Sequence, residues 1–254
     1  MTTKTLFVSG SAAHPTVGTL LKTTSVQTFE VLATTGLDFI VLDAEHAPFD
    51  RRDLDLMMLA QKACAFPALV RLPDDRPATI LNVLDLDAAG IIVPHVTSAT
   101  QAREIVRSAR FRNGRRGFSI SPRFAGFGTR SRADALDHGD TAFIGVQIED
   151  RDALSVLDDI AAVDGIDALV IGRADLALSM GFEDPGETPV EDAIQQIITA
   201  AVRHDKIAAL FVSSAAQVHS YASVGASCFV LSTDQALLRN GALSVLSPIK
   251  QKAS

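Results

Sequence analysis

The sequence predicts a (β/α)8 barrel, or TIM barrel, from three observations. Eight short β-rich segments alternate strictly with eight helix-like segments along the 254 residues. The β-rich segments are almost continuously apolar, as expected for parallel strands that are covered on both faces. A length of about 250 residues is typical of one such barrel. A nucleotide-binding sheet would use fewer strands, so we expect residues 1–254 to form a single barrel domain that ends in a C-terminal helix.

The individual elements follow from the periodicity of the apolar residues. In chain order, the expected strands are Thr16–Leu21, Phe39–Leu42, Ala68–Arg71, Gly90–Pro94, Phe143–Ile148, Ala168–Ile171, Ala208–Val212 and Cys228–Leu231. The segments between them have apolar residues at a spacing of three to four, which is typical of helices with one buried face. In the same order, the expected helices are Val26–Thr34, Asp53–Lys62, Ala78–Leu84, Ala99–Ala109, Ala153–Ala162, Val190–His204, Ala215–Ala222 and Gln235–Leu246.

The stretch between Pro94 and Phe143 departs from this alternation. It contains one expected helix followed by the Gly-, Arg- and Ser-rich run FRNGRRGFSISPRFAGFGTRSRADALDHGD, and nine arginines fall between Arg103 and Arg132. Long loops in compact domains usually have a function or form an interface. We consider a solvated face, a subunit contact and steering of an anionic substrate as alternatives, and the sequence does not place this stretch relative to the catalytic face.

Composition excludes several classes of partner. The net charge of −7 argues against a nucleic-acid surface that covers the whole protein, and the chain has no apolar run of the ~18 residues that span a membrane. The N-terminal apolar stretch is too short for a convincing signal peptide. Cys64 and Cys228 lie in apolar segments, where buried free thiols are expected rather than a disulfide. These features predict a cytoplasmic protein.

Catalytic side chains of such barrels lie at the carboxyl ends of the strands. The candidate residues at those ends are Asp43, Glu45 and His46 after the second strand, Arg71 after the third, His95 after the fourth, Gln147, Glu149 and Asp150 after the fifth, Gly172, Arg173 and Asp175 after the sixth, and Asp234 after the eighth.

Glu149 and Asp175 follow neighbouring strands and therefore face one mouth. Two carboxylates there would repel each other without a cation, and a hard divalent cation removes the conflict. The alternative is that either acid caps the helix that follows it. The pair predicts a divalent-metal site.

His46 is the preferred general base, because an unperturbed imidazole titrates near neutral pH. Asp43 lies three residues earlier and is placed to accept one ring N–H, which would fix the tautomer. His95 also follows a strand, but it has no adjacent acid in the sequence and ranks lower.

Arg71 is flanked by apolar residues, so its guanidinium needs an anionic partner. That partner is either a substrate carboxylate or enolate oxygen, or an acid such as Glu45. None of the six lysines lies within the third to eighth strands, so Schiff-base catalysis is disfavoured and metal-assisted stabilisation of an enolate is favoured.

Six motifs in register resemble the HpcH/HpaI aldolase family, also called class II pyruvate aldolases. They are DAEHAPFD, RLP, LDLDAAGIIVPHV, the GRRG of Gly114–Gly117, VQIED and IGRADLALSMG, and the resemblance runs from Val17 to Leu246. It implies a barrel of the phosphoenolpyruvate/pyruvate-domain type. The implied reaction is reversible cleavage of a 4-hydroxy-2-oxo acid to pyruvate and an aldehyde with Mg²⁺, Mn²⁺ or Co²⁺. The resemblance also implies a trimer or a hexamer in which neighbours exchange the C-terminal helix.

The resemblance also implies a role for particular residues. Glu149 and Asp175 match the metal ligands, Arg71 the group that stabilises the pyruvate enolate, and His46 with Asp43 the base. The remaining matches are Gln147 as a substrate contact, Gly172, Ala174 and Asp175 as the loop that holds the pyruvate carboxylate, Glu45 as an acid near the metal's water ligands, and Asp85 as an acid presented to a neighbouring subunit's site.

Three positions depart from the family pattern: Arg173 replaces a proline, Asp87 a common glycine, and Leu20 a large aromatic residue of some homologues. Arg173 would either bind a second carboxylate or phosphate on the electrophile or point to solvent. Alternative activities are a citrate-synthase-like condensation of the type used in siderophore pathways, decarboxylation of oxaloacetate, and non-catalytic binding of a 2-oxo acid.

Overall fold

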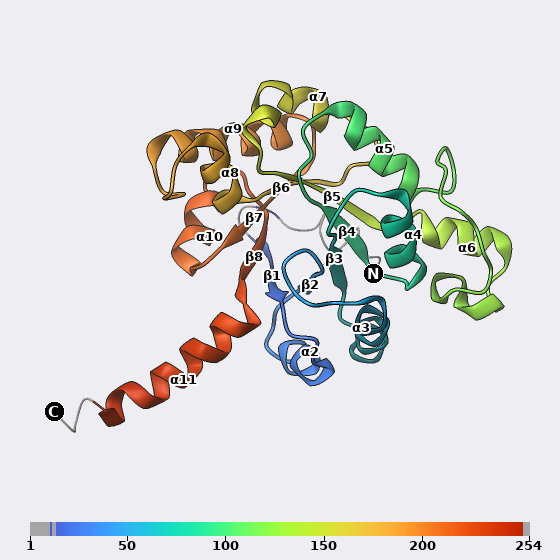
Figure 1. Cartoon of the computed structure of the whole chain (residues 1–254), viewed down its shortest axis with the longest axis horizontal. Helices are drawn as coiled ribbons and strands as arrows, with labels where there is room; N and C mark the ends of the chain where they lie inside the picture. The colour runs from blue at the N-terminus through green and yellow to red at the C-terminus, as the bar shows by residue number, and fades with distance from the viewer. Residues whose placement is uncertain (1–10, 12–13, 251–254) are drawn as a thin grey trace.

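Eight parallel strands close into a barrel with helices around its outside (Figure 1). The structure is a computed structural model that describes residue 11 and residues 14–250. The strands are β1 Thr16–Leu21, β2 Phe39–Asp43, β3 Ala68–Arg71, β4 Gly90–Val93, β5 Phe143–Ile148, β6 Ala168–Ile171, β7 Ile207–Val212 and β8 Cys228–Thr233. The helices are α2 Val26–Leu32, α3 Arg51–Cys64, α4 Pro77–Asp85, α5 Ala99–Ala109, α6 Arg132–Gly139, α7 Leu157–Ala161, α8 Arg173–Met180, α9 Thr188–Arg203, α10 Ala215–Ala222 and α11 Asp234–Lys250.

The barrel confirms the predicted fold class and the order of its strands. Every strand pairs in parallel with its neighbours in the sequence, and β8 pairs with β1 to close the sheet. One apolar core lies inside the barrel and a larger one lies between the strands and the helices, which explains the apolar faces on both sides of each strand. Because all strands run the same way, all of their carboxyl ends meet at one mouth.

Local sequence signals explain where several helices begin and end. Asp50 caps α3 in a reciprocal arrangement with Asp53, and Ser98 caps α5 by accepting the backbone N–H of Gln101. Pro77 lies in the first turn of α4, where a missing N–H has little cost. These signals set the bounds of helices whose tertiary position depends on the barrel.

Two helices were not predicted from the sequence. Helix α6 contains few apolar residues, so its buried contact through Ala135 leaves almost no periodic signal. Helix α8 is short and lies between two glycines, Gly172 and Gly181. The segment expected as one helix over Ala153–Ala162 is instead a 3₁₀ helix, Arg151–Val156, followed by the short α7.

The arginine-rich stretch lies at the opposite end of the barrel from the mouth, since it joins the end of α5 to the beginning of β5. It contains α6 and a 3₁₀ segment, Arg123–Gly128, that is interrupted where Gly126 and Phe127 adopt left-handed φ angles. Phe124 anchors a small apolar cluster within this stretch. The structure therefore places the stretch away from the catalytic face, a position that the sequence did not determine.

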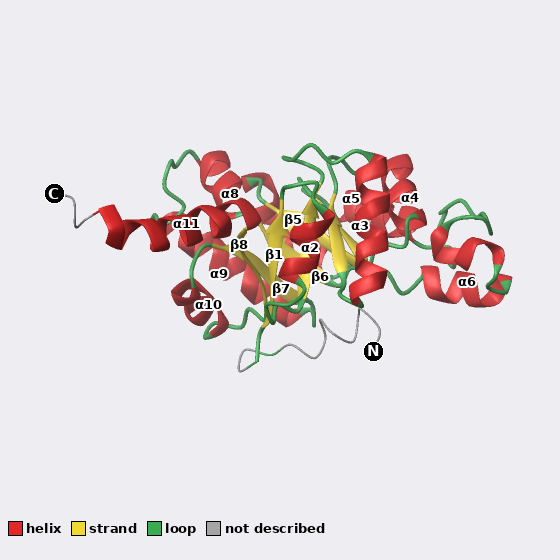
Figure 2. Ribbon diagram, turned by 90° about the horizontal axis from the view of Figure 1, so that it is seen from below, coloured by secondary structure: helices red, strands yellow, loops and turns green. Residues whose placement is uncertain are grey.

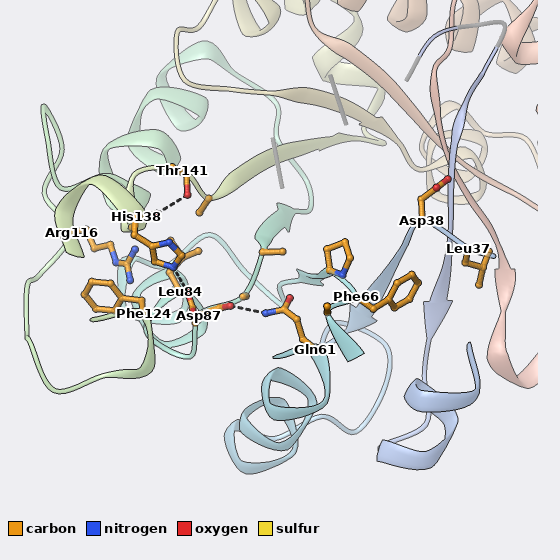
Figure 3. Close-up of a pocket in the computed structure, with 16 residues that line it drawn as sticks. Leu37, Asp38, Gln61, Phe66, Leu84, Asp87, Arg116, Phe124, His138 and Thr141 are labelled. Atoms are coloured by element: carbon orange, nitrogen blue, oxygen red, sulfur yellow. Dashed lines mark hydrogen bonds and ion pairs between the residues drawn. The ribbon is translucent and has the colours of Figure 1, made fainter. Parts of the chain in front are cut away.

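A cavity of about 520 Å³ lies between this stretch and the barrel (Figure 3). Phe66, Leu84 and Phe124 contribute to its lining, and His138 Nε2 lies 2.6 Å from Asp87 Oδ1 beside it. The Asp87 carboxylate thus connects the arginine-rich stretch to the barrel.

Helix α11 extends away from the barrel (Figures 1 and 2). Its first residue, Asp234, is buried and accepts hydrogen bonds from the backbone N–H groups of Lys22 (2.9 Å) and Thr23 (3.2 Å). Further along, apolar side chains such as Leu238 and Ile249 are exposed. The helix is therefore fixed at its beginning and uncovered along its length.

No helix within the described residues is long and apolar enough to cross a membrane. Cys64 and Cys228 are both free thiols, as the sequence predicts, but only Cys228 is buried, whereas Cys64 is half-buried. Burial raises the pKa of Cys228.

Candidate active site

The register of β2 and β3 brings Asp43 and Arg71 together at the mouth. The two residues are Cα partners across the strands. Arg71 donates from Nε to Asp43 Oδ1 at 3.0 Å, and its Nη2 lies 2.8 Å from Oδ2. Lys22 Nζ, at the end of β1, lies 3.2 Å from the same Oδ2. Burial acts to raise the pKa of Asp43, but Arg71, the backbone N–H of His46 and Lys22 together outweigh it, so the pKa lies below its usual value.

The contacts of His46 differ from the sequence-based expectation. Asp43 Oδ1 accepts the backbone N–H of His46 at 3.2 Å and is otherwise engaged by Arg71, so the expected bond to the imidazole is not formed. Instead, His46 Nε2 lies 3.7 Å from Glu45 Oε2, which is also 3.3 Å from Arg71 Nη1. The alternative ion pair between Arg71 and Glu45 is therefore present in addition to the pair with Asp43. Asp43 therefore positions the Arg71 guanidinium and, through the backbone N–H of His46, the loop that carries His46.

Glu149 and Gln147 come from the end of β5 and are both buried. Gln147 donates from Nε2 to Glu149 Oε2, and Glu149 Oε1 accepts the backbone N–H of His95 at 3.0 Å. A Cβ at Gly172 would lie 2.9 Å from Glu149 Cβ and 3.0 Å from Gln147 Nε2. Position 172 therefore requires glycine, because any side chain would displace the glutamate.

A pocket of about 500 Å³ opens at the mouth beside these groups. Its lining includes His46, Arg71, Gln147, Arg173 and Asp175. Gly172 and Ala174 also line it, at the beginning of α8. The N–H groups in the first turn of a helix have no partner within the helix, so this end of α8 suits an anionic group. The structure thus brings the predicted base, the predicted arginine and one predicted metal ligand to one pocket.

Arg173 does not point to solvent, so that alternative was wrong. Its side chain is only 12% exposed, and Nη2 donates to Glu191 Oε1 at 3.0 Å. The guanidinium also lies over the Tyr221 ring, whose hydroxyl donates to Glu191 at 2.8 Å. Burial is the main cause that raises the pKa of Tyr221. Arg173 therefore links α8 to α9 and α10 while it contributes to the pocket wall.

Asp85 is the last residue of α4, at the end of the barrel opposite the mouth. It accepts a hydrogen bond from Arg116 Nη2 at 3.0 Å. The carboxylate therefore takes no part in the site of its own chain, and the role toward a neighbouring subunit stays a prediction.

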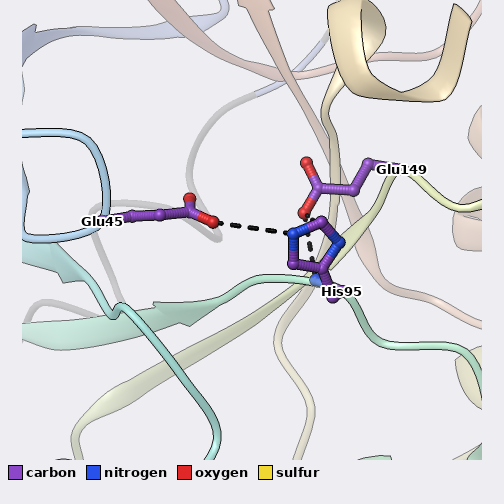
Figure 4. Close-up of side chains that lie close together, drawn as sticks. All are labelled: Glu45, His95 and Glu149. Atoms are coloured by element: carbon purple, nitrogen blue, oxygen red, sulfur yellow. Dashed lines mark hydrogen bonds and ion pairs between the residues drawn. The ribbon is translucent and has the colours of Figure 1, made fainter. Parts of the chain in front are cut away.

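A cluster that the sequence did not indicate forms between β2, β4 and β5 (Figure 4). Glu45, His95 and Glu149 each offer one ligand atom, and these atoms lie within 4.8 Å of one another. Asp175, the residue predicted to share a cation with Glu149, is not part of this cluster among the described residues. The structure groups Glu149 with Glu45 and His95 instead. Burial raises the pKa of Glu45, partly opposed by Arg71.

His95 was ranked low because no acid adjoins it in the sequence. The carboxylates of Glu149 and Asp150, which contact His95, follow the neighbouring strand β5. Val93 of β4 pairs with Val146 of β5, so the residues that follow the two strands lie side by side. Burial acts to lower the pKa of His95, but Asp150 and Glu149 outweigh it and the pKa is raised. Comparing the ends of adjacent strands, rather than neighbours in the sequence, would have found this residue.

Taken together, the mouth contains buried carboxylates, the buried guanidinium of Arg71 and the imidazoles of His46 and His95 beside a pocket. Buried carboxylates without a matching number of cations fit a divalent cation, and the guanidinium fits an anionic oxygen of a substrate. Fold and site thus define a (β/α)8-barrel enzyme.

Comparison with known proteins identifies the family. The family model described as HpcH/HpaI aldolase/citrate lyase matches residues 17–241, and the chain belongs to this family. It is 33% identical over 224 residues to the 5-keto-4-deoxy-D-glucarate aldolase of Klebsiella pneumoniae, with 87% of each chain covered. It is also 33% identical over 227 residues to the hydroxypyruvate/pyruvate aldolase of Roseobacter denitrificans, with 88% of each covered.

A solved structure supports the same assignment. The HpcH/HpaI aldolase from Desulfitobacterium hafniense superposes with a TM-score of 0.90 at 28% identity and covers 98% of this chain and 97% of that one. The chain is therefore a lyase of the aldolase type that acts on a small molecule, in agreement with the resemblance found in the sequence.

Proposed function

We propose that the protein is a divalent-metal-dependent aldolase that reversibly cleaves a 4-hydroxy-2-oxo acid to pyruvate and an aldehyde. The observation that carries the proposal is the placement of Arg71. Asp43 holds its guanidinium at the wall of the mouth pocket, beside Gln147 and near the buried Glu149. A fixed guanidinium at this position can stabilise negative charge as it develops on the oxygen of an enolate.

Glu149 and Asp175 are the residues that we expect to hold the cation. Glu149 is 1% exposed, and among the described residues its polar contacts are with Gln147 and His95, without a guanidinium or ammonium partner, which fits a role as a ligand. Asp175 lines the pocket at the beginning of α8. When bound, a divalent cation would supply positive charge to the oxygens of the 2-oxo acid. The HpcH/HpaI family assignment supports a bound divalent cation, and the group that Glu149 forms with Glu45 and His95 supports a position near Glu149.

The residues of the chain divide the remaining work. The beginning of α8, at Gly172 and Ala174, receives the C1 carboxylate, and Gln147 contacts the 2-oxo group. His46 removes the proton of the 4-hydroxyl group, and the C3–C4 bond then breaks to give the aldehyde. The electron pair moves into the enolate of pyruvate, which Arg71 stabilises until C3 takes up a proton. Glu45 orients both His46 and Arg71 through the contacts at 3.7 and 3.3 Å.

The class of electrophile is suggested by the relatives and by Arg173. One relative is named for 5-keto-4-deoxy-D-glucarate and another for hydroxypyruvate and pyruvate, so we propose a polar or anionic electrophile. If Arg173 binds a second carboxylate, Arg173→Ala should raise the KM for electrophiles that carry one and leave the KM for neutral aldehydes unchanged. An equal change in both would assign Arg173 to structure alone, through Glu191.

We propose further that the chain works as a single barrel domain in a cytoplasmic trimer or hexamer, with Mg²⁺, Mn²⁺ or Co²⁺ as cofactor. The free thiols of Cys64 and Cys228 support a reducing compartment. The apolar residues exposed on α11 support assembly through the C-terminal helix. Sedimentation of the full chain and of a variant shortened before α11 tests this assembly.

The decisive experiment is a pyruvate-release assay over a panel of 4-hydroxy-2-oxo acids, after dialysis against a chelator and with each metal added back. We expect release that depends on added metal. Loss of CO₂ from oxaloacetate without any aldol cleavage would support the decarboxylase alternative. Consumption of oxaloacetate with an acyl donor would support the citrate-synthase-like condensation, and binding of pyruvate without turnover would support a non-catalytic role.

A further inference from the structure

Lys22 directly follows β1 and places an ammonium group at the mouth of the barrel. Its side chain is 22% exposed, and Nζ lies 3.2 Å from Oδ2 of Asp43, which is fully buried. Among the described residues, the lining of the mouth pocket includes Arg71 but not Lys22. Any effect of the ammonium on a substrate in this pocket therefore passes through Asp43.

The charge balance around Arg71 gives the ammonium a role. The guanidinium contacts two carboxylates, since Nε and Nη2 lie 3.0 and 2.8 Å from Asp43 and Nη1 lies 3.3 Å from Glu45. Two formal negative charges against one positive charge would make this wall of the pocket unfavourable for an anionic substrate. The Lys22 ammonium supplies the second positive charge and makes the formal charge of the four groups zero.

Asp234 fixes the backbone that carries this ammonium. The Asp234 side chain is buried, and its Oδ1 accepts the backbone N–H of Lys22 at 2.9 Å. Its Oδ2 accepts the backbone N–H and the hydroxyl group of Thr23 at 3.2 and 2.6 Å. Hydrogen bonds to an ionised carboxylate are stronger than those between neutral groups. The segment that follows β1 is therefore held firmly at the beginning of α11.

An irregularity at the end of β8 brings Asp234 to this segment. Gly18 of β1 pairs with Val230, but Leu20 pairs with Thr233, so β8 contains one extra residue. Ser232 has a φ of 62°, in the left-handed region that residues other than glycine rarely adopt. Such bulges redirect side chains near active sites, and backbone strain of this kind is retained where a site requires it. Asp234 follows at the point where α11 leaves the barrel beside β1 (Figure 1).

We propose that Lys22 is a positioning residue for the enolate, and that it acts through Asp43 on Arg71. The ammonium balances the Asp43 carboxylate, so the Arg71 guanidinium keeps its place and its positive charge toward the pocket. Pyruvate carries one negative charge and its enolate carries two, so the effect is larger on the enolate than on bound pyruvate. The inference rests on the proposed function, because it assigns Lys22 to the step that forms the enolate.

The test follows formation of the enolate without an electrophile. Exchange of the methyl protons of pyruvate is measured by nuclear magnetic resonance on the full chain with saturating Mg²⁺. Lys22→Met keeps the apolar stem and removes the ammonium, and it should lower kcat for exchange by ~10-fold, less than the ~10²–10³-fold of a direct donor. The KM for pyruvate should change by about twofold or less, since the ground state carries less charge.

Two further variants separate charge from shape. Lys22→Arg retains a positive charge and should restore most of the wild-type rate, whereas Lys62→Met, a matched change at an exposed lysine of α3, should have no effect. Asp234→Asn loses one acceptor for Thr23 and should lower kcat in the same direction by a smaller factor.

Binding of oxalate, a planar dianion that resembles the enolate, is measured by calorimetry on the same samples. We expect Lys22→Met to weaken oxalate binding more than pyruvate binding. The proposal is overturned by wild-type exchange in Lys22→Met, by an equal loss in Lys22→Arg, by a rise in KM as large as the fall in kcat, or by unchanged oxalate affinity. If the wild type exchanges no protons, the proposed reaction is refuted, and the oxalate affinities still decide the role of Lys22.

Discussion

Two arginines are buried at opposite ends of the barrel, and their surroundings differ. The Arg71 side chain is 7% exposed, contacts the carboxylates of Asp43 and Glu45, and lines the mouth pocket. The Arg116 side chain is 1% exposed, forms an ion pair with Asp85, and lies between two phenylalanine rings at 4.4 and 4.6 Å from their centroids. Burial lowers the pKa of Arg116.

The difference concerns charge balance and access. The Arg116 guanidinium donates to the Asp85 carboxylate, and the rings of Phe111 and Phe124 cover its faces. At the mouth, the carboxylates of Asp43, Glu45 and Glu149 outnumber the guanidinium of Arg71 and the ammonium of Lys22, and one side of Arg71 is open to a pocket. A buried charge with a neutralising partner and covered faces stabilises the fold, whereas a surplus of buried charge beside a pocket is suited to a ligand or to catalysis. The following variants test this distinction.

The largest effect is expected for Glu149→Gln. The change keeps the shape of the side chain and removes its charge, so metal binding and metal-dependent pyruvate release should be lost while the thermal unfolding temperature stays close to wild type. The reason is that few protein ligands hold the cation. Asp175→Asn should behave alike. Full activity of either variant at micromolar metal would contradict the assignment of that residue as a ligand.

The next largest effect is expected for His46→Ala, which distinguishes the role of the general base from that of the cation. His46→Ala should lose aldol cleavage yet keep decarboxylation of oxaloacetate, because loss of CO₂ requires no deprotonation of a hydroxyl group. A general base contributes ~10²–10⁴-fold, so the two rates should diverge by about that factor. Both are measured as pyruvate formation with the same enzyme. A parallel fall in both activities would make His46 a positioning residue and direct the search for the base to Glu45.

Arg71→Lys should reduce kcat by ~10²–10³-fold, although the charge is retained. Lysine lacks the planar fork with which Arg71 binds both oxygens of Asp43, so the remaining donor is displaced from the pocket. Exchange of the methyl protons of pyruvate, followed by nuclear magnetic resonance, reports this step without an electrophile. Exchange at the wild-type rate would show that Arg71 does not stabilise the enolate.

Arg116→Met should have the smallest effect on catalysis and a clear effect on stability. The thioether still packs between the two rings, but Asp85 loses its partner, so we expect a loss of roughly 2–4 kcal/mol in the free energy of unfolding. Urea unfolding measures this loss, and kcat per folded molecule should not change. If kcat falls as much in Arg116→Met as in Asp85→Asn, the predicted role of Asp85 at a neighbouring subunit's site gains support. Arg116 would then contribute to catalysis, as Arg71 does, and not to stability alone.

The sequence by itself determined the barrel, because parallel strands covered on both faces and helices with one buried face leave distinct periodicities. It also indicated Asp43, Arg71, Gln147 and Glu149, since each follows an apolar strand and the carboxyl ends of parallel strands meet at one mouth. The structure shows these four side chains at that mouth.

Tertiary structure alone decided which of these groups are neighbours. The bond between Arg71 and Asp43, the left-handed backbone of His95 and its approach to Glu149 all depend on the register and closure of the sheet. The same holds for Arg173, whose partner Glu191 lies on another helix. Periodicity reports which face of an element is buried, but it carries no information about the distance between side chains on different strands, and the chemistry of the site depends on that distance.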